Sequence, residues 1–235
     1  MKLRLDKYLA DMGIGTRSEV KKAITKGQVQ VNQQVEKRPE YKLDTELDCV
    51  HFQGIPVTYA EYEYYMLNKP AGVISATEDK KETTVIDLIN TRQRKDLFPV
   101  GRLDRDTEGL LLITNDGELA HRLLSPKKHV DKVYYARIRG KVTEMDVEQF
   151  RMGVDIGEDR LTLPANLEII YSGEESEIRL TIREGKFHQV KRMFQSVGKE
   201  VTYLKRLQMG SLMLDESLKP GEYRILTRKE LDELC

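Results

Sequence analysis

The chain has 235 residues, enough for one large domain or for a small domain joined to a larger one. Hydrophobic residues make up 39% and charged residues 33%, and no apolar stretch is long enough to span a bilayer, so we expect a soluble cytoplasmic protein and exclude an integral membrane protein. The formal net charge is zero, but residues 1–42 contain ten Lys and Arg against five Asp and Glu, so positive charge is concentrated near the N-terminus.

The first part of the chain predicts two short helices followed by strands. Apolar residues at 5–12 follow the i, i+3, i+4, i+7 spacing of a helix with one buried face. Thr16 and Glu19 then form the capping-box pattern that begins a second helix. Valines alternate with glutamine at 29–31, as in a strand, and the polar residues at 32–34 predict a turn.

Four basic residues lie on or next to the second predicted helix: Arg17, Lys21, Lys22 and Lys26. A run of charge is usually only the solvated face of a helix. The stretch LDKYLADMGIGTRSEVKKAITKGQVQVN, however, resembles the S4 RNA-binding domain, and the positive face falls on the same residues. We therefore expect these four side chains to contact RNA phosphates, which would position the protein without reading the base sequence.

The S4-like segment is expected to end before residue 59. An acidic stretch at 43–48, a predicted strand at 49–52 and a polar stretch at 58–63 indicate the end of a domain and a linker. The predicted domains are therefore residues 1–58 and residues 59–235. Early in the second domain, residues 64–67 and 73–74 predict two strands joined by a turn.

The segment GRLDRDTEGLLLITN at 101–115 places a polar loop before an apolar run at 110–113, which predicts a buried strand. Loops held by a rigid strand often carry chemistry, so Asp104 and Asp106 are candidate reactive carboxylates. Asp and Gly are also ordinary turn residues, and Arg–Asp pairs are ordinary surface salt bridges. On these grounds alone, a structural loop is the better explanation.

A resemblance to a known family favours a catalytic role for this loop over a purely structural one. GRLDRDTEGLLL is similar, without a gap, to the signature of the pseudouridine synthases, in particular the bacterial ribosomal branch with an N-terminal S4-like domain. The resemblance implies that Asp104 is the nucleophile of an enzyme that isomerises uridine to pseudouridine in small-subunit (16S) ribosomal RNA. The target base would leave its stack, and we expect Arg102 to fill the vacated space. Lys69 lies in what is a framework motif of this family and is a weak site candidate.

The segment at 132–138 alternates like a strand, which puts Lys132 and Tyr134 on one face. Lys132 could then meet an RNA phosphate while Tyr134 offers its ring to a base. A cross-strand Tyr in a sheet explains the same pattern equally well. The Lys-x-Tyr pattern also matches the family, and this resemblance implies that Tyr134 stacks on the target base.

The segment EGKFHQVKRMF closely resembles the third motif of the family. It follows a predicted strand at 178–182, and its apolar spacing predicts a helix, on which Lys191 would otherwise be an ordinary solvated basic residue. The resemblance implies that Lys191, at a position where many relatives carry Arg, pairs with Asp104 and favours its ionised form. The segment at 204–214 resembles the final sheet segment of the family, in which Leu204 would form a wall of the pocket.

We therefore expect an α+β fold: a small S4-like α/β RNA-binding domain, then a pseudouridine synthase catalytic domain whose mainly antiparallel mixed sheet is flanked by helices. No metal-ligand spacing or nucleotide-binding fingerprint appears, and the isomerisation needs no net redox change, so neither a cofactor nor a metal is expected. The expected partner is ribosomal RNA, within an assembling small-subunit particle. A membrane partner is not expected, and the chain is expected to act as a monomer.

Three alternatives make different predictions. A large-subunit (23S) rRNA pseudouridine synthase would share the chemistry, although KFHQVKRMF, LTLPANLE and the lack of a long basic C-terminal tail favour the small-subunit branch. A metal-dependent RNA phosphodiesterase would hold a divalent ion on Asp104 and Asp106 and would be sensitive to a chelator. A non-catalytic S4-type RNA-binding or ribosome-assembly protein would show no chemical consequence when Asp104 is substituted.

Overall fold

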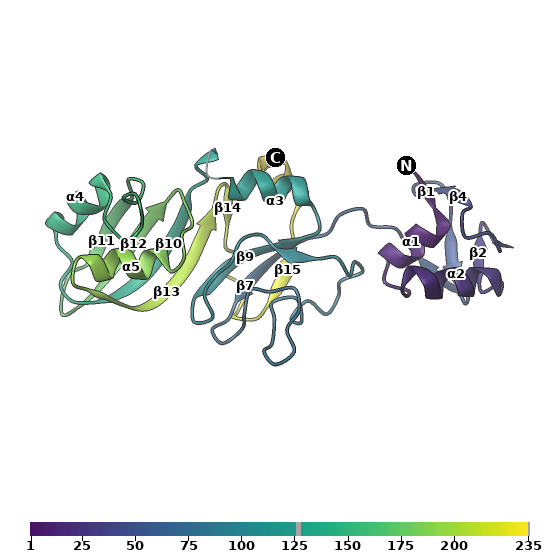
Figure 1. Cartoon of the computed structure of the whole chain (residues 1–235), viewed down its shortest axis with the longest axis horizontal. Coiled ribbons are helices and arrows are strands. Elements are labelled where there is room, and N and C mark those ends of the chain that lie inside the picture. The colour runs from purple at the N-terminus through teal and green to yellow at the C-terminus, as the bar shows by residue number, and fades with distance from the viewer. Residues whose placement is uncertain (126–127, 235) are drawn as a thin grey trace. The chain divides into compact units, whose positions relative to one another are not determined.

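The computed structural model describes residues 1–125 and 128–234, and the chain forms two compact units (Figure 1). The first unit combines Met1–Glu63 with Asn90–Leu97, and the second combines Tyr64–Ile89 with the chain from Phe98 onward. Among the residues described, no helix has both the length and the apolar character needed to cross a membrane.

The first unit packs two helices against two small antiparallel sheets. Its elements, in chain order, are β1 (Lys2–Arg4), α1 (Leu5–Asp11), α2 (Arg17–Thr25), β2 (Val29–Val31), β3 (Gln34–Val35), β4 (Lys42–Asp44), β5 (Val50–Phe52) and β6 (Ile55–Val57). One sheet pairs β1 with β4, and the other runs in the order β3-β2-β5-β6. Both helices and several strands contribute to one apolar core: Leu5, Tyr8, Leu9, Met12, Val20, Ile24, Val29, Val31, Leu43 and Val50.

The predicted helix start and turn in this unit are confirmed. The Thr16 hydroxyl accepts a hydrogen bond from the Glu19 backbone N–H at 3.3 Å, and the Glu19 carboxylate accepts one from the Thr16 N–H at 2.8 Å. These two bonds close the predicted capping box at the start of α2. Asn32 and Gln33, both with positive φ, form the tight turn from β2 to β3. Local hydrogen bonds and turn residues therefore set the limits of these elements.

A segment from further along the chain completes the first unit. The Arg94 side chain is buried and pairs with Asp96 at 2.6 Å and with Asp11 at 3.5 Å. The Glu63 carboxylate accepts hydrogen bonds from the backbone N–H groups of Gln93, at 3.1 Å, and Arg94, at 2.9 Å. This contribution was not predicted, because ion pairs between distant segments leave no local sequence pattern. The domain boundary between residues 58 and 59 remains a prediction.

The second unit is built on a mainly antiparallel mixed sheet, as predicted. Its strands are β7 (Tyr64–Lys69), β8 (Phe98–Pro99), β9 (Glu108–Thr114), β10 (Lys132–Arg139), β11 (Asn166–Tyr171), β12 (Glu175–Ile182), β13 (Glu200–Met209), β14 (Leu212–Met213) and β15 (Tyr223–Ile225). They run in the order β11-β12-β10-β13-β9-β7-β15, with β14 on β13 and β8 on β9. Among these pairings, only β13 with β9 is parallel.

Four helices flank this sheet in the part of the chain described: α3 (Gly117–Leu124), α4 (Glu144–Met152), α5 (Gln189–Ser196) and α6 (Arg228–Leu234). α4 contacts β11 and α5 contacts β13, so both lie beside the strands from β10 to β13 (Figure 1). The strand predicted at 73–74 is wrong: Ile74 forms only an isolated bridge with Thr84. The physical reason is that β7 already pairs with β9 on one edge and with β15 on the other, so no edge is free.

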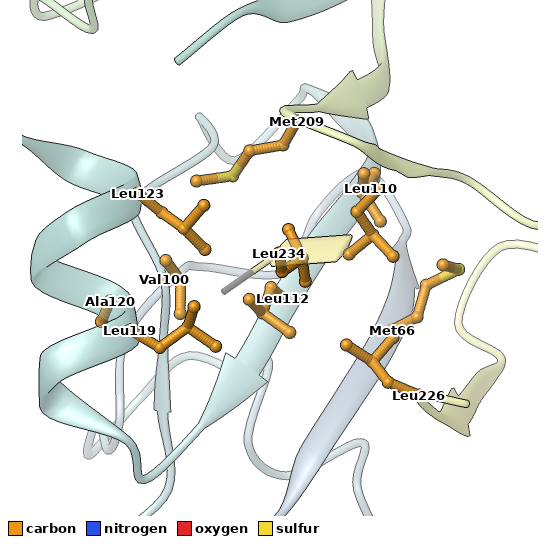
Figure 2. Close-up of a cluster of buried hydrophobic side chains, with 11 residues drawn as sticks. Met66, Val100, Leu110, Leu112, Leu119, Ala120, Leu123, Met209, Leu226 and Leu234 are labelled. Carbon is orange, nitrogen blue, oxygen red and sulfur yellow. The ribbon is translucent and has the colours of Figure 1, made fainter. Parts of the chain in front are cut away.

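The strand β9 is buried on both faces, as its uninterrupted apolar run predicted. On one face, α3 packs three side chains against β9, and Figure 2 shows Leu119, Ala120 and Leu123 opposite the strand. The full cluster joins residues from β7, β9, α3, β13 and the C-terminal segment: Met66, Val100, Leu110, Leu112, Leu119, Ala120, Leu123, Met209, Leu212, Leu226 and Leu234. The loop that precedes β9 is therefore attached to a strand that is buried in the core of the second unit.

Candidate active site

The loop between β8 and β9 carries Asp104, and Gly109 determines how this loop meets β13. In the short parallel pairing of β9 with β13, Gly109 lies opposite Arg206. Gly109 has a φ of +101°, and a Cβ at this position would lie 2.2 Å from the Arg206 carbonyl oxygen. Only glycine fits such a close backbone approach. The glycine thus brings the Asp104 loop beside β13, the strand that carries Leu204.

Lys69 holds the same loop through its main chain. Its side chain is fully buried, and Nζ donates hydrogen bonds to the carbonyl oxygens of Pro70 at 3.0 Å, Arg105 at 3.2 Å and Thr107 at 2.9 Å. Burial lowers the pKa of Lys69 to about 8, although the carboxylates of the loop oppose the shift. Sequence reasoning treated Lys69 as a weak candidate. A lysine at the end of an otherwise apolar strand was the available signal for this anchoring role.

The Asp104 carboxylate meets two side chains from the start of α5. Lys191 Nζ lies 3.0 Å from Oδ2, and His188 Nε2 lies 3.6 Å from Oδ1. Lys191 also donates a 2.6 Å hydrogen bond to Oδ1 of Asp106. The structure thus brings Lys191 and Asp104 together, and one ammonium group bridges two carboxylates.

The two neighbouring carboxylates keep the Lys191 ammonium charged. Partial burial lowers the pKa of Lys191, but the hydrogen bonds to Asp106 and Asp104 outweigh it and leave the pKa above its ordinary value. Burial likewise raises the pKa of Asp106, but the hydrogen bond from Lys191 outweighs it and leaves that pKa lowered. At neutral pH, Asp104 therefore faces a fixed positive charge.

Helix α5 positions Lys191 by burying its other face. Val190, Met193 and Phe194 are buried, as the apolar spacing predicted. The residue before the helix, His188, is its N-cap and adopts a left-handed backbone with a φ of 49°, which is uncommon for a residue other than glycine. His188 was not predicted as a site residue, because the spacing of the four histidines suggests no site.

Beside Asp104 lies a narrow pocket of about 70 Å³, which we call the inner pocket. Its walls come from the Asp104 loop, from β10 and β13, and from the start of α5. Tyr134 and Leu204 face it from β10 and β13, which are adjacent antiparallel strands. Five predicted site residues line this single pocket: Arg102, Asp104, Tyr134, Lys191 and Leu204.

Two predicted residues of this unit, Arg102 and Lys132, differ in their surroundings. Arg102 is exposed, and within the described part of the chain no hydrogen bond or ion pair joins its side chain. Lys132 shares the buried face of β10 with Tyr134, as predicted, but it is only 8% exposed and its Nζ donates to the Val130 carbonyl at 3.0 Å. Burial lowers the pKa of Lys132, and Arg206 adds to the effect. Lys132 does not line the inner pocket, and its contact with a phosphate remains a prediction.

In the first unit, the four predicted RNA-contact residues form what we call the basic face: Arg17, Lys21, Lys22 and Lys26. All four are exposed, on α2 or at its C-cap. Asp6, which is fully buried, organises part of this face: its carboxylate lies 3.5 Å from Arg17 Nε and 3.9 Å from Lys21 Nζ. Burial raises the pKa of Asp6, but hydrogen bonds from arginines, Arg4 foremost, outweigh it and leave the pKa lowered. Sequence analysis did not identify Asp6.

The two carboxylates of the candidate active site both form an ion pair with Lys191. Within residues 1–125 and 128–234, no group of three or more His, Cys, Asp or Glu side chains is arranged to hold a metal ion. The two carboxylates of the metal-dependent alternative, Asp104 and Asp106, share the Lys191 ammonium. A divalent ion at this position would have to displace that ammonium.

Comparisons with known proteins cover almost the whole chain. A family model described as RNA pseudouridylate synthase matches residues 63–196, and one described as S4 domain matches residues 3–48. A Bacillus subtilis protein described as the uncharacterized RNA pseudouridine synthase YtzG is 49% identical over 231 residues, which cover 97% of each chain.

Enzymes named ribosomal small subunit pseudouridine synthase A are similar over the same length. That of Vibrio cholerae is 44% identical over 230 residues, and that of Escherichia coli K12 is 39% identical over 231 residues, with 97% of this chain and 98% of the relative covered in both cases. The crystal structure of a pseudouridylate synthase, 39% identical, superposes with a TM-score of 0.70 over 99% of this chain and 100% of that one.

Proposed function

This chain belongs to the RNA pseudouridylate synthase family, in the branch of the ribosomal small subunit pseudouridine synthase A enzymes, and we propose that it modifies one uridine of small-subunit ribosomal RNA with Asp104 as its nucleophile. It is an RNA pseudouridine synthase with an S4 domain. The relatives named for a ribosomal subunit support the small-subunit target. We further propose that the enzyme acts in the cytoplasm, as a monomer, on an assembling small-subunit particle.

The observation that carries the assignment of Asp104 is its position between a cation and a pocket. The reaction breaks the C1′–N1 glycosidic bond, turns the uracil and joins C5 to C1′. C5 loses its proton and N1 gains one, so that no atom and no electron is gained or lost overall. A carboxylate can serve this reaction as a nucleophile or as a base. Asp104 is 25% exposed, lines the inner pocket and lies 3.0 Å from the Lys191 ammonium.

The other lining residues receive the base. Tyr134 supplies the ring on which the flipped uracil stacks, and Leu204 supplies an apolar wall. At about 70 Å³ the inner pocket is well below the roughly 300 Å³ typical of small-molecule sites, and we expect its side chains to move apart when the base enters. The guanidinium of Arg102, which has no hydrogen-bond or ion-pair partner among residues 1–125 and 128–234, is available to occupy the space that the base leaves in the RNA.

The proposed activity and target can be tested with purified enzyme on transcripts of the small-subunit and large-subunit ribosomal RNAs and on small-subunit particles. We expect pseudouridine in the small-subunit RNA, measured by digestion to nucleosides and mass spectrometry. Asp104→Asn keeps the side-chain shape but removes the charge, so we expect a loss of at least about 10³-fold in rate with RNA affinity retained. Asp106→Asn is the matched control, because Asp106 also binds Lys191 but is 72% exposed, and we expect a loss within about tenfold.

Other outcomes would change particular parts of the proposal. Retained activity in Asp104→Asn would remove Asp104 from the nucleophile role. Product in the large-subunit RNA alone would transfer the target to that subunit and leave the chemistry in place.

A further inference from the structure

A second, wider hollow opens next to the inner pocket and shares Arg102, Asp104 and His188 with it. We call it the outer hollow; its lining comes from residues 74–76, 101–105 and 185–188. Its volume of about 600 Å³ lies within the roughly 300–1,000 Å³ of small-molecule sites, and it is far larger than the inner pocket. A strand of RNA whose target base occupies the inner pocket would therefore have the outer hollow beside it.

An exposed aromatic ring stands at this hollow. Phe187 is 74% exposed, and its ring lies nearly parallel to the His188 imidazole, with 3.8 Å between the centroids and 20° between the planes. His188 is the side chain that approaches Asp104. Most of the Phe187 surface is left open, so the core does not explain this residue, and its ring is available to a flat ligand.

The backbone that carries Phe187 is fixed by its neighbours. Arg192 donates a 3.1 Å hydrogen bond to the Phe187 carbonyl and is itself held by Glu158 at 2.8 Å. The Gln189 side chain accepts a hydrogen bond from the Lys186 N–H at 2.9 Å and donates one to Glu184 at 2.8 Å. An aromatic ring on such a fixed segment loses little conformational freedom when it binds a ligand.

Besides the Asp104 carboxylate, three cationic side chains line the hollow, and two of them are available to a phosphate. Arg102 is exposed and is unpaired within the described residues, and Arg105, 61% exposed, has a single ion pair there, with Glu82 at 3.1 Å. The third cation, Lys186, is already balanced by Glu158 at 3.4 Å and Glu184 at 3.9 Å. A stacking ring beside two arginines matches a nucleotide, whose base is flat and whose phosphate is negative.

We propose that the outer hollow binds the nucleotide adjacent to the target uridine in single-stranded RNA, with its base on Phe187 and its phosphate at Arg105, while Arg102 occupies the space that the target base leaves. This inference rests on the proposed function, since it assumes a uridine beside Asp104. Every base has a stacking face, so Phe187 would position the strand without selecting its sequence. Phe187 is thus a positioning residue for the reaction.

The first test compares Phe187→Ala, Phe187→Tyr and wild type on the small-subunit RNA. Loss of one stacked base should raise KM by about tenfold or more in Phe187→Ala, while kcat stays within a few fold and Phe187→Tyr restores the wild-type KM. The matched control is Tyr171→Ala, which truncates an aromatic of the same unit that is 61% exposed and lines neither hollow. A KM in Phe187→Ala equal to that of wild type would overturn the proposal.

The second test measures the stacking of a base on Phe187 directly and does not require the ribosomal RNA target. The probe is a single-stranded oligouridine with one 2-aminopurine, titrated with Asp104→Asn enzyme so that no turnover occurs. We expect a change in 2-aminopurine fluorescence on binding that disappears in Asp104→Asn/Phe187→Ala and persists with Tyr at 187. A signal independent of Phe187 would overturn the stacking assignment. If wild type fails on small-subunit RNA but the Phe187-dependent signal is present, the subsite stands and the proposed target fails.

Discussion

At the scale of single residues, the chemistry depends on one ammonium between two carboxylates. Lys191 contacts Asp104 at 3.0 Å and Asp106 at 2.6 Å, and the pKa of Lys191 is raised, so the lysine is cationic throughout the neutral range. The ammonium holds the Asp104 carboxylate in one orientation beside the inner pocket. Removing the cation should therefore slow the reaction without emptying the pocket.

We expect Lys191→Met to lower the single-turnover rate by about 100-fold, which corresponds to about 2.7 kcal/mol in the activation free energy. Lys191→Arg should stay within about tenfold of wild type, because a guanidinium can also reach both carboxylates. Thermal unfolding of each variant controls for loss of structure. A Met variant as fast as wild type would show that the lysine has no part in the chemistry.

The residues of the site differ in how far sequence could predict them. Three site residues lie in sequence motifs of the family: Asp104, Tyr134 and Lys191. The order of residues within each motif does not depend on how the loops between the motifs are arranged, so the resemblance was enough to identify these residues. Lys69 and His188 act through carbonyl contacts and an unusual backbone angle, which depend on the folded chain. Such roles have no signature in the order of residue types.

At the scale of elements, the C-terminal helix α6 is held to β15 by a small ionic cluster. Arg224 makes two hydrogen bonds to the Glu230 carboxylate, at 2.9 and 2.7 Å, and one to Asp215 at 2.6 Å. The Thr227 N–H also donates to Glu230, at 2.7 Å, at the start of α6. The hydrogen bonds from Arg224 lower the pKa of Glu230 from 4.5 to about 2, against a smaller opposing effect of burial.

The direction of this shift sets a pH dependence. A carboxyl whose folded pKa lies below its unfolded pKa stabilises the fold above the unfolded value, and loses that effect as the pH falls through the folded one. Glu230→Gln should therefore lower the free energy of unfolding by about 1–2 kcal/mol at pH 7, after allowance for solvent screening. The gap to wild type should close between pH 4.5 and about 2. Urea unfolding at several pH values measures it, and a gap that stayed constant would contradict this explanation.

Element limits were the part of the fold that sequence predicted best. The start of α2 and the strand β9 followed from a capping box and an apolar run, which are local patterns. The strand expected at 73–74 failed because sheet edges are a property of the whole topology, and both edges of β7 were taken. The segment Asn90–Leu97 joined the first unit through ion pairs that only folding brings together.

At the scale of the whole molecule, two units divide the work between binding and chemistry. The S4 domain presents the basic face, and the second unit presents the inner pocket and the outer hollow. Lysine and arginine contacts to phosphates release counterions, so their contribution to affinity falls as salt rises. The basic face should therefore govern affinity and salt dependence but not the rate of the bound complex.

The test variant replaces all four residues of the basic face by Gln: Arg17, Lys21, Lys22 and Lys26. We expect RNA binding to weaken by at least about tenfold at low salt, and the slope of log Kd against log salt to fall by up to about 3. The rate at saturating RNA should not change. The matched control removes four exposed cations from the second unit: Lys141, Arg151, Arg228 and Lys229. An equal loss of slope in the control would mean that total charge, and not the basic face, determines binding.

The roles of Asp104 and of small-subunit RNA are tested together by mapping pseudouridine in ribosomal RNA from cells with and without this gene. Carbodiimide adducts read by reverse transcription locate each modified site. We predict that one small-subunit site disappears without the gene, returns with the wild-type chain and with Asp106→Asn, and does not return with Asp104→Asn. An unchanged small-subunit pattern in cells that lack the gene would contradict the assigned target.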